Sequence, residues 1–174
     1  MNKSCFAVKP TSRRILRNKA KAIRLTYSLD DNIKLDVVRF LEHVLTDVFP
    51  SLSVEIVEKF DGEKDKCGEF DFLQDKIRIP EERYRKAIEG DGRARFDILH
   101  ECSHKMLITP KSMVFCQFAR KLKNFEDPEW QADCLAGELL MPIDKIRGMS
   151  IEEVAEYCGV TKAAAKFQLS KIYL

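Results

Sequence analysis

The chain has 174 residues, 45% of them hydrophobic, which suits one compact domain with a small appendage and excludes both two full domains and a disordered chain. The chain has 30 lysines and arginines and 28 aspartates and glutamates. This formal net charge of +2 does not indicate binding to nucleic acid or to an anionic membrane through bulk positive charge.

Two amphipathic helices are predicted in the first fifty residues. In residues 12–25, apolar side chains recur at near-helical spacing among lysines and arginines. The basic side of this helix is either a solvated face or a docking strip for an acidic partner or a nucleic-acid backbone. In residues 33–48, apolar side chains recur every three or four positions with charges between them, and Pro50 ends the helix.

Extended segments follow. Residues 52–60 alternate with a period of two, Asp61 and Gly62 supply a turn, and residues 70–72 and 76–79 alternate in the same way. This region predicts a small antiparallel sheet. A short helix is expected to begin at Pro80.

Two of the three histidines stand four residues apart in the string H-E-x-x-H, as His100 and His104. On an α-helix these positions lie one turn apart on nearly the same face, so both imidazoles can bind one metal ion. Glu101 is rotated by about 100° around the helix and flanks the ion, which is the place of a general base. The flanking residues favour a buried helix that carries this motif.

Two further side chains were weighed as ligands and set aside. His43 lies in the middle of its predicted helix without an acidic or cysteine companion at ligand spacing, which is typical of a structural or surface histidine. Cys102 is turned about 200° away from both motif histidines on a helix, so we expect a packed thiol.

A third metal ligand is predicted on a later helix, because catalytic zinc usually has three protein ligands and a water. Asp127 can cap that helix and Pro128 suits its first position, which places Glu129 in the first turn. Glu129 is the candidate ligand; the alternative is an acidic residue favoured by the helix dipole. Asp133, one turn later, is expected to orient a ligand histidine or else to be an exposed carboxylate. The ligand types favour Zn²⁺, with Mn²⁺ and Fe²⁺ as alternatives.

Two motifs together resemble those of the ImmA/IrrE family of zinc metallo-endopeptidases. They are R-F-x-x-x-H-E-x-x-H at residues 95–104 and E-x-x-A-D-x-x-A-x-x-L-L-M-P at residues 129–142. The resemblance covers about half of the chain from Ile77 onward and continues into the tail. Asp97 and Ser103 depart from it, because an uncharged residue and glycine are usual at these two positions.

The resemblance implies an α+β fold of the reduced zincin-like type. It also implies that His100, His104 and Glu129 bind the zinc ion and that Glu101 is the catalytic glutamate. Members of the family cleave intracellular regulatory proteins, notably phage-type or mobile-element repressors that carry a helix-turn-helix. The expected partner is therefore such a repressor.

The C-terminal tail has a helix-turn-helix-like pattern. Ser150 can cap one helix with Glu153 closing a capping box, Gly159 makes a turn, and Thr161 can cap a second helix that runs towards the end of the chain. A DNA-reading helix needs several basic or amide side chains, and few are available here. Substrate docking or simple packing is therefore favoured over direct DNA binding.

These observations divide the chain into a basic helical arm (1–30), a zincin-like metallopeptidase domain (31–145) and a C-terminal helical pair packed on it (146–174). The expected function is zinc-dependent cleavage of a regulatory protein, with Glu101 activating a zinc-bound water. Two alternatives stay open: a metal-stabilised regulator that sequesters a transcription factor without cutting it, and a DNA-binding module acting through the tail.

The cellular compartment is inferred from the cysteines and from the absence of targeting patterns. The six cysteines include no C-x-x-C pair, which argues against a zinc ribbon, and the first residues lack the apolar run of a signal peptide. No apolar run approaches the roughly 18 residues of a membrane span. We therefore expect a cytoplasmic protein with reduced thiols and no membrane association.

Overall fold

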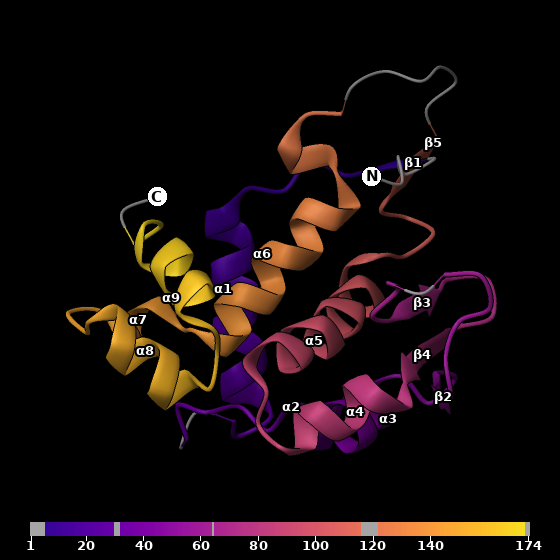
Figure 1. The fold of residues 1–174 in the computed structure, drawn as a ribbon. Helices are drawn as coiled ribbons and strands as arrows, with labels where there is room; N and C mark the ends of the chain where they lie inside the picture. The colour runs from indigo at the N-terminus through magenta and orange to yellow at the C-terminus, as the bar shows by residue number, and fades with distance from the viewer. Residues whose placement is uncertain (1–5, 30–31, 64, 116–121, 173–174) are drawn as a thin grey trace.

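The computed structural model describes residues 6–29, 32–63, 65–115 and 122–172, and these form a mixed α and β structure (Figure 1). In chain order the elements are β1 (Phe6–Val8), α1 (Arg13–Thr26), α2 (Val37–Arg39), the π-helix η1 (Phe40–Leu45), α3 (Thr46–Val48), β2 (Ser53–Val57), β3 (Glu69–Asp71), β4 (Lys76–Pro80), α4 (Glu81–Ile88), α5 (Gly92–Leu107), β5 (Met113–Phe115), the 3₁₀-helix η2 (Asn124–Glu126), α6 (Pro128–Leu140), α7 (Ile143–Ile146), α8 (Ile151–Cys158) and α9 (Lys162–Leu169). The predicted α+β class is confirmed. Cys5, Cys116 and the last two residues of the tail lie outside the described residues.

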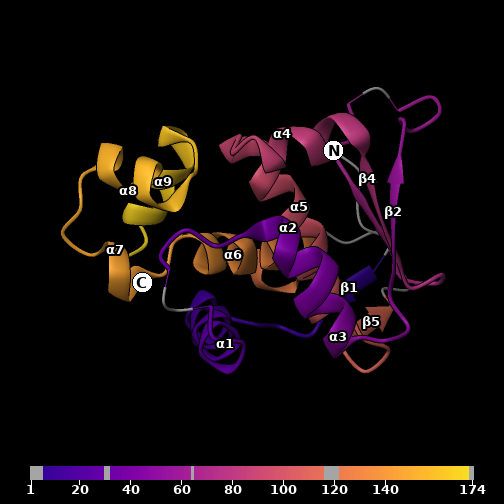
Figure 2. The same ribbon diagram turned by 90° about the horizontal axis from the view of Figure 1, so that it is seen from below.

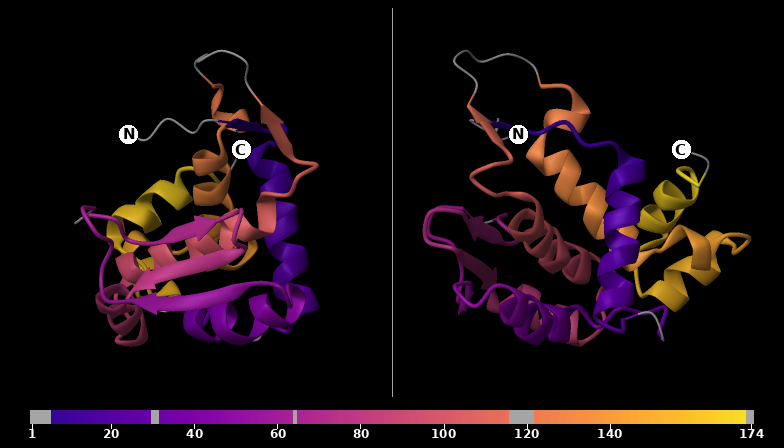
Figure 3. Two further views of the ribbon diagram at one scale, coloured as in Figure 1. Left: turned by 90° about the vertical axis from the view of Figure 1, so that its right-hand side faces the viewer. Right: turned by 180° about the vertical axis from the view of Figure 1, so that it is seen from behind.

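Helices α5 and α6 lie side by side at the centre of the molecule. Helix α1 runs along α6, while the main sheet and α4 pack against α5 (Figures 1 and 3). The tail helices lie on the opposite side of this centre from the sheet (Figure 2). The interface is apolar: Leu99 of α5 and Leu135 and Leu139 of α6 are fully buried. Burial of each such side chain stabilises the fold by about 1.5–3 kcal/mol.

Local capping chemistry fixes where four of the helices begin. The three predicted N-caps each accept a backbone N–H group: Asp127 begins α6, Ser150 begins α8 and Thr161 begins α9. Ser12, which was not predicted as a cap, begins α1 in the same way. At Ser150 the capping box with Glu153 is complete in both directions. These predictions are confirmed because each rests on contacts within four residues of sequence.

The helix expected over residues 33–48 begins later than predicted. Its helical residues run from Val37 to Val48 through α2, η1 and α3. The start is delayed because the Asp36 carboxylate accepts a hydrogen bond from the Arg39 N–H at 3.0 Å and so caps the helix. The preceding Leu35 lies outside the helix and is buried in the core.

The main sheet corrects the prediction of an antiparallel arrangement. Its strand order is β2-β4-β3, with β2 parallel to β4 and β3 antiparallel to β4. Strand β4 takes the centre because Ile77 and Ile79 are fully buried there, whereas the two outer strands are only partly covered. The chain therefore crosses from β2 to the far edge before β4 returns between them. A second, two-stranded sheet, β1 paired antiparallel with β5, was not predicted.

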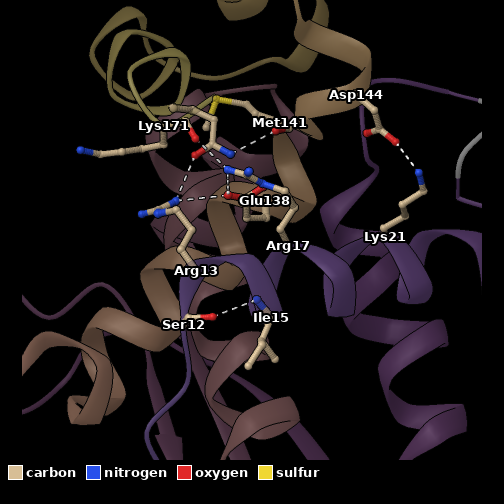
Figure 4. Close-up of polar contacts among 10 residues, drawn as sticks. Ser12, Arg13, Ile15, Arg17, Lys21, Glu138, Met141, Asp144 and Lys171 are labelled. Atoms are coloured by element: carbon tan, nitrogen blue, oxygen red, sulfur yellow. Dashed lines mark hydrogen bonds and ion pairs between the residues drawn. The ribbon is translucent and has the colours of Figure 1, made fainter. Parts of the chain in front are cut away.

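Three arginines of the basic helix α1 form bonds inside the protein. Arg13 and Arg17 pair with Glu138 of α6 at 3.3 and 3.0 Å, and the Glu138 side chain is completely buried (Figure 4). Arg24 is buried and donates hydrogen bonds to the carbonyl oxygens of Leu139 and Leu29. These contacts join α1 to the helical centre.

The tail forms two helices, α8 and α9, joined through Gly159 in the left-handed conformation with a φ of 61°. The N-terminus of α5 lies directly on this connection, since a Cβ atom added at Gly92 would lie 2.7 Å from the Val160 carbonyl carbon. The helix-turn-helix interpretation of this pair stays a prediction. None of the helices in the described ranges combines the length and hydropathy of a membrane-spanning segment.

Replacement of Glu138 by glutamine should lower the free energy of unfolding by about 3 kcal/mol, because two largely buried guanidinium groups would face a neutral amide. The measurement is urea-induced unfolding. The matched control is Asp144→Asn, whose pair with Lys21 is 2.9 Å long but exposed on both sides. That change should cost less than about 1 kcal/mol. Equal losses for the two variants would contradict the assigned role of Glu138.

Candidate metal centre

The residues predicted to bind a metal come from the two central helices. Helix α5 carries both motif histidines in its second half. Helix α6 begins at Pro128, where the Asp127 carboxylate accepts the N–H of Glu129 at 3.0 Å. Because α5 and α6 pack side by side, the first turn of α6 lies next to the histidine face of α5. The structure thus brings together residues separated by a long stretch of chain.

Three ligand atoms form a compact triangle. The Nε2 atoms of His100 and His104 lie 2.9 Å apart, and the Oε2 atom of Glu129 lies 3.3 Å from the first and 3.5 Å from the second. Ligand atoms around a tetrahedral zinc ion are separated by about 3.3–3.4 Å when the ion lies 2.0–2.1 Å from each. The spacing of these three atoms fits one such ion without movement of either helix. Among the described residues, this is the group of three that offers metal-ligand atoms at close range.

Asp133, which was expected either to orient a ligand histidine or to be an exposed carboxylate, contacts one of the histidines. Its Oδ1 atom lies 2.8 Å from the Nδ1 atom of His100. A carboxylate that accepts the Nδ1 proton leaves the lone pair of Nε2 directed towards the centre of the triangle. The structure therefore places Asp133 against the far side of a candidate ligand.

The surrounding charges favour a cation at the centre of the triangle. Burial alone would lower the pKa of His100, but its hydrogen bonds to Asp133 and Glu129 raise that pKa to about 10. Hydrogen bonds from His100 and His104 hold the pKa of Glu129 well below its usual range, in spite of partial burial. The carboxylates therefore create a negative environment around the Nε2 atoms, which suits a divalent cation.

Glu101 lies beside the sheet, where strand β3 meets α5. Burial raises the pKa of its carboxyl group, although the two neighbouring imidazoles act in the opposite direction. The backbone N–H of Phe70 in β3 donates a hydrogen bond to the carboxylate. Gly68 approaches so closely that an added Cβ atom would lie 2.7 Å from the Glu101 Cγ atom. The edge of the sheet thus fixes where this carboxylate lies.

Sequence reasoning missed both Gly68 and the Phe70 backbone. The available signal was a glycine at the start of an extended segment, which is typical of close backbone approach. That signal does not say which residue is approached, because the contact joins two elements that are distant in sequence.

The two residues set aside as ligands lie outside the triangle. The Cys102 thiol is fully buried, and burial raises its pKa, so the prediction of a packed thiol is confirmed. His43 lies exposed on η1, in agreement with a surface histidine. Cys67, Cys102, Cys134 and Cys158 are free thiols.

Both departures from the family pattern have structural roles away from the triangle. Asp97 is buried and forms ion pairs with Arg83 at 3.3 Å and Arg93 at 3.0 Å. Ser103 is buried and donates a hydrogen bond to the Leu99 carbonyl oxygen at 2.8 Å. Neither side chain belongs to the group of metal-ligand atoms.

One family model matches the part of the chain that contains these residues. Residues 86–170 match the family model Peptidase_M78, described as the IrrE N-terminal-like domain. This region is similar to an IrrE N-terminal-like domain. The resemblance to the ImmA/IrrE family is thereby confirmed, and it points to a metallopeptidase with a metal cofactor. No curated protein matches the chain. The IrrE N-terminal-like domain contains α5, α6, α8 and α9, and with them all five predicted site residues.

Replacement of Gly68 by alanine should displace Glu101 and lower the free energy of unfolding by about 1–3 kcal/mol, because the added methyl group overlaps the glutamate side chain. In a protein that also carries Glu101→Ala, the overlap is absent and the loss should disappear. Urea unfolding of the four proteins in this double-mutant cycle measures the coupling. The same loss in both backgrounds would show that Gly68 does not act against Glu101.

Proposed function

We propose that the chain is a zinc-dependent endopeptidase that cleaves an intracellular regulatory protein of the helix-turn-helix repressor class. The observation that carries this proposal is the triangle of two imidazole nitrogens and one carboxylate oxygen, 2.9–3.5 Å apart, with the Glu101 carboxylate on the same helix. The IrrE N-terminal-like domain supports the peptidase class. The substrate class rests on the family resemblance.

The donor set fits catalytic zinc. His100, His104 and Glu129 would hold the ion, since two imidazoles and one carboxylate are a common ligand set that leaves a fourth position open to water. When bound, zinc supplies Lewis acidity that lowers the pKa of water towards about 7 and polarises a peptide carbonyl.

Glu101 would act as the general base and then as the general acid. Its raised pKa makes the carboxylate a stronger proton acceptor than an exposed glutamate, and the Phe70 N–H holds it in place. The carboxylate takes a proton from the water whose oxygen attacks the scissile carbonyl carbon. It then delivers that proton to the amine nitrogen as the carbon–nitrogen bond breaks. No covalent intermediate with the protein is required.

Replacement of Glu101 by glutamine should leave about one zinc per chain and reduce cleavage by about 10²–10⁴-fold, the usual contribution of a general base. The assay is incubation with the repressor encoded beside the gene, followed by analysis of fragments. Glu152→Gln on α8 is the matched control, because Glu152 is exposed and far along the chain from the triangle. Normal proteolysis by the Glu101 variant would refute the assignment. A stable complex with an intact repressor would favour the sequestering regulator.

Added zinc should stabilise the metal-free protein against unfolding, and it should do so only by binding to the three ligand atoms of the triangle. At a free zinc concentration of 100 times the dissociation constant, the expected gain is about 2.7 kcal/mol, because the ion binds only the folded state. His104→Ala should lose this gain, whereas Glu101→Gln should keep it. Thermal unfolding with and without zinc after treatment with a chelator measures the effect. Zinc stabilisation that persists in the His104 variant would place the ion elsewhere.

A further inference from the structure

A cavity of about 350 Å³ lies between α5, α6 and α9, with one residue of α1 at its border. Its lining includes Phe96, Trp130, Met141, Ala164 and Phe167. Met141 is buried, whereas the Phe167 ring is 55% exposed and lies where the cavity meets solvent. The cavity therefore combines an apolar interior with an aromatic side chain that a bound group can reach.

The cavity lies beside the candidate metal centre and shares Asp133 with its surroundings. Asp133 lines it and also holds the Nδ1 atom of His100 at 2.8 Å. Phe96 precedes His100 by one turn of α5, and Trp130 directly follows Glu129 on α6. A group bound in this cavity would therefore lie next to the residues that would hold the metal.

The charged side chains at the cavity border have partners within the protein. The Arg13 guanidinium lies 6.0 Å from the centroid of the Trp130 ring and 5.6 Å from that of Phe167. Arg13 pairs with the buried Glu138 carboxylate at 3.3 Å (Figure 4), and Arg93, the other arginine of the lining, forms an ion pair within α5 at 3.0 Å. Because both arginines already have carboxylate partners in the protein, an apolar or aromatic group is favoured over an acidic one.

The tail helix α9 forms a fixed side of this cavity. The Gln168 side chain is buried and donates to the Met141 carbonyl oxygen at 3.3 Å, and Arg17 donates to the Lys171 carbonyl oxygen at 2.8 Å. These bonds hold α9 against its neighbours, with Ala164 and Phe167 lining the cavity. This gives the tail a role beside the metal centre.

We infer that this cavity receives an apolar side chain, aromatic or large aliphatic, of the polypeptide that is cleaved at the metal centre. The inference rests on the proposed function and adds a substrate preference to it: the protein selects a cleavage site with an apolar residue near the scissile bond. The C-terminal pair would then be part of the substrate-binding surface.

Trp130 provides a test that does not depend on catalysis, because it is the only tryptophan of the chain. The full-length protein is titrated with N-acetyl-phenylalanine amide, and with N-acetyl-glycine amide as the control probe. We expect a saturable change in tryptophan emission with the aromatic amide and none with the glycine amide. Ala164→Phe, which fills the cavity, should abolish the change.

Two aromatic residues of the tail give a matched pair of variants. Phe167 and Tyr157 are 55% and 53% exposed, but Tyr157 does not line the cavity. Phe167→Ala should weaken binding of the aromatic amide by about tenfold or more, whereas Tyr157→Ala should leave it unchanged. Because Phe167 is largely exposed, its variant is expected to fold even if the cavity-filling variant does not.

The cleavage assay extends the test to the substrate. With peptides that carry an apolar residue beside the cut, Phe167→Ala should raise KM by about tenfold and leave kcat unchanged, whereas Tyr157→Ala should change neither. Cleavage of such peptides without any probe binding, or an equal response of the two variants, would overturn the inference alone. Saturable probe binding in a protein that cleaves nothing would overturn the proposed function.

Discussion

The packing of α5 against α6 is the constraint on which the site depends. The two histidines on α5 are aligned by the helix itself, but Glu129 reaches them only because the first turn of α6 lies against the same face. Ala136 on α6 and Cys102 on α5 are small, fully buried and part of the same hydrophobic core. Larger side chains there would force the helices apart and separate the oxygen from the nitrogens. The packing of α5 against α6 therefore determines both the core and the geometry of the metal-ligand atoms.

Features that depend on neighbours in sequence could be predicted. The caps at Asp127 and Ser150 and the spacing of His100 and His104 involve at most one helical turn, where the geometry is fixed by hydrogen bonds within the element. Glu129 could be proposed because its helix start is encoded locally and catalytic zinc needs a third ligand. The family motifs then joined these local observations into one site.

Features that depend on distant partners could not be predicted. The sequence of β2 and β4 does not say that they pair in parallel, because the strand order depends on tertiary packing, which buries Ile77 and Ile79 of β4 in the core. The approach of Gly68 to Glu101 and the pairing of β1 with β5 join segments with no shared local signal. The role of the basic face of α1 could not be predicted either. An arginine that pairs with a buried carboxylate and an arginine that is exposed to water can occupy the same positions in a helical pattern.

The buried Glu138 cluster also sets the smallest autonomous unit of the protein. The IrrE N-terminal-like match spans residues 86–170 and includes Glu138, whereas its partners Arg13 and Arg17 precede that span. An excised fragment with the boundaries of the match would leave an uncompensated carboxylate inside an apolar interface and would lose the helix that covers α6. Helix α1 therefore contributes to the stability of the matched region although it lies outside the match.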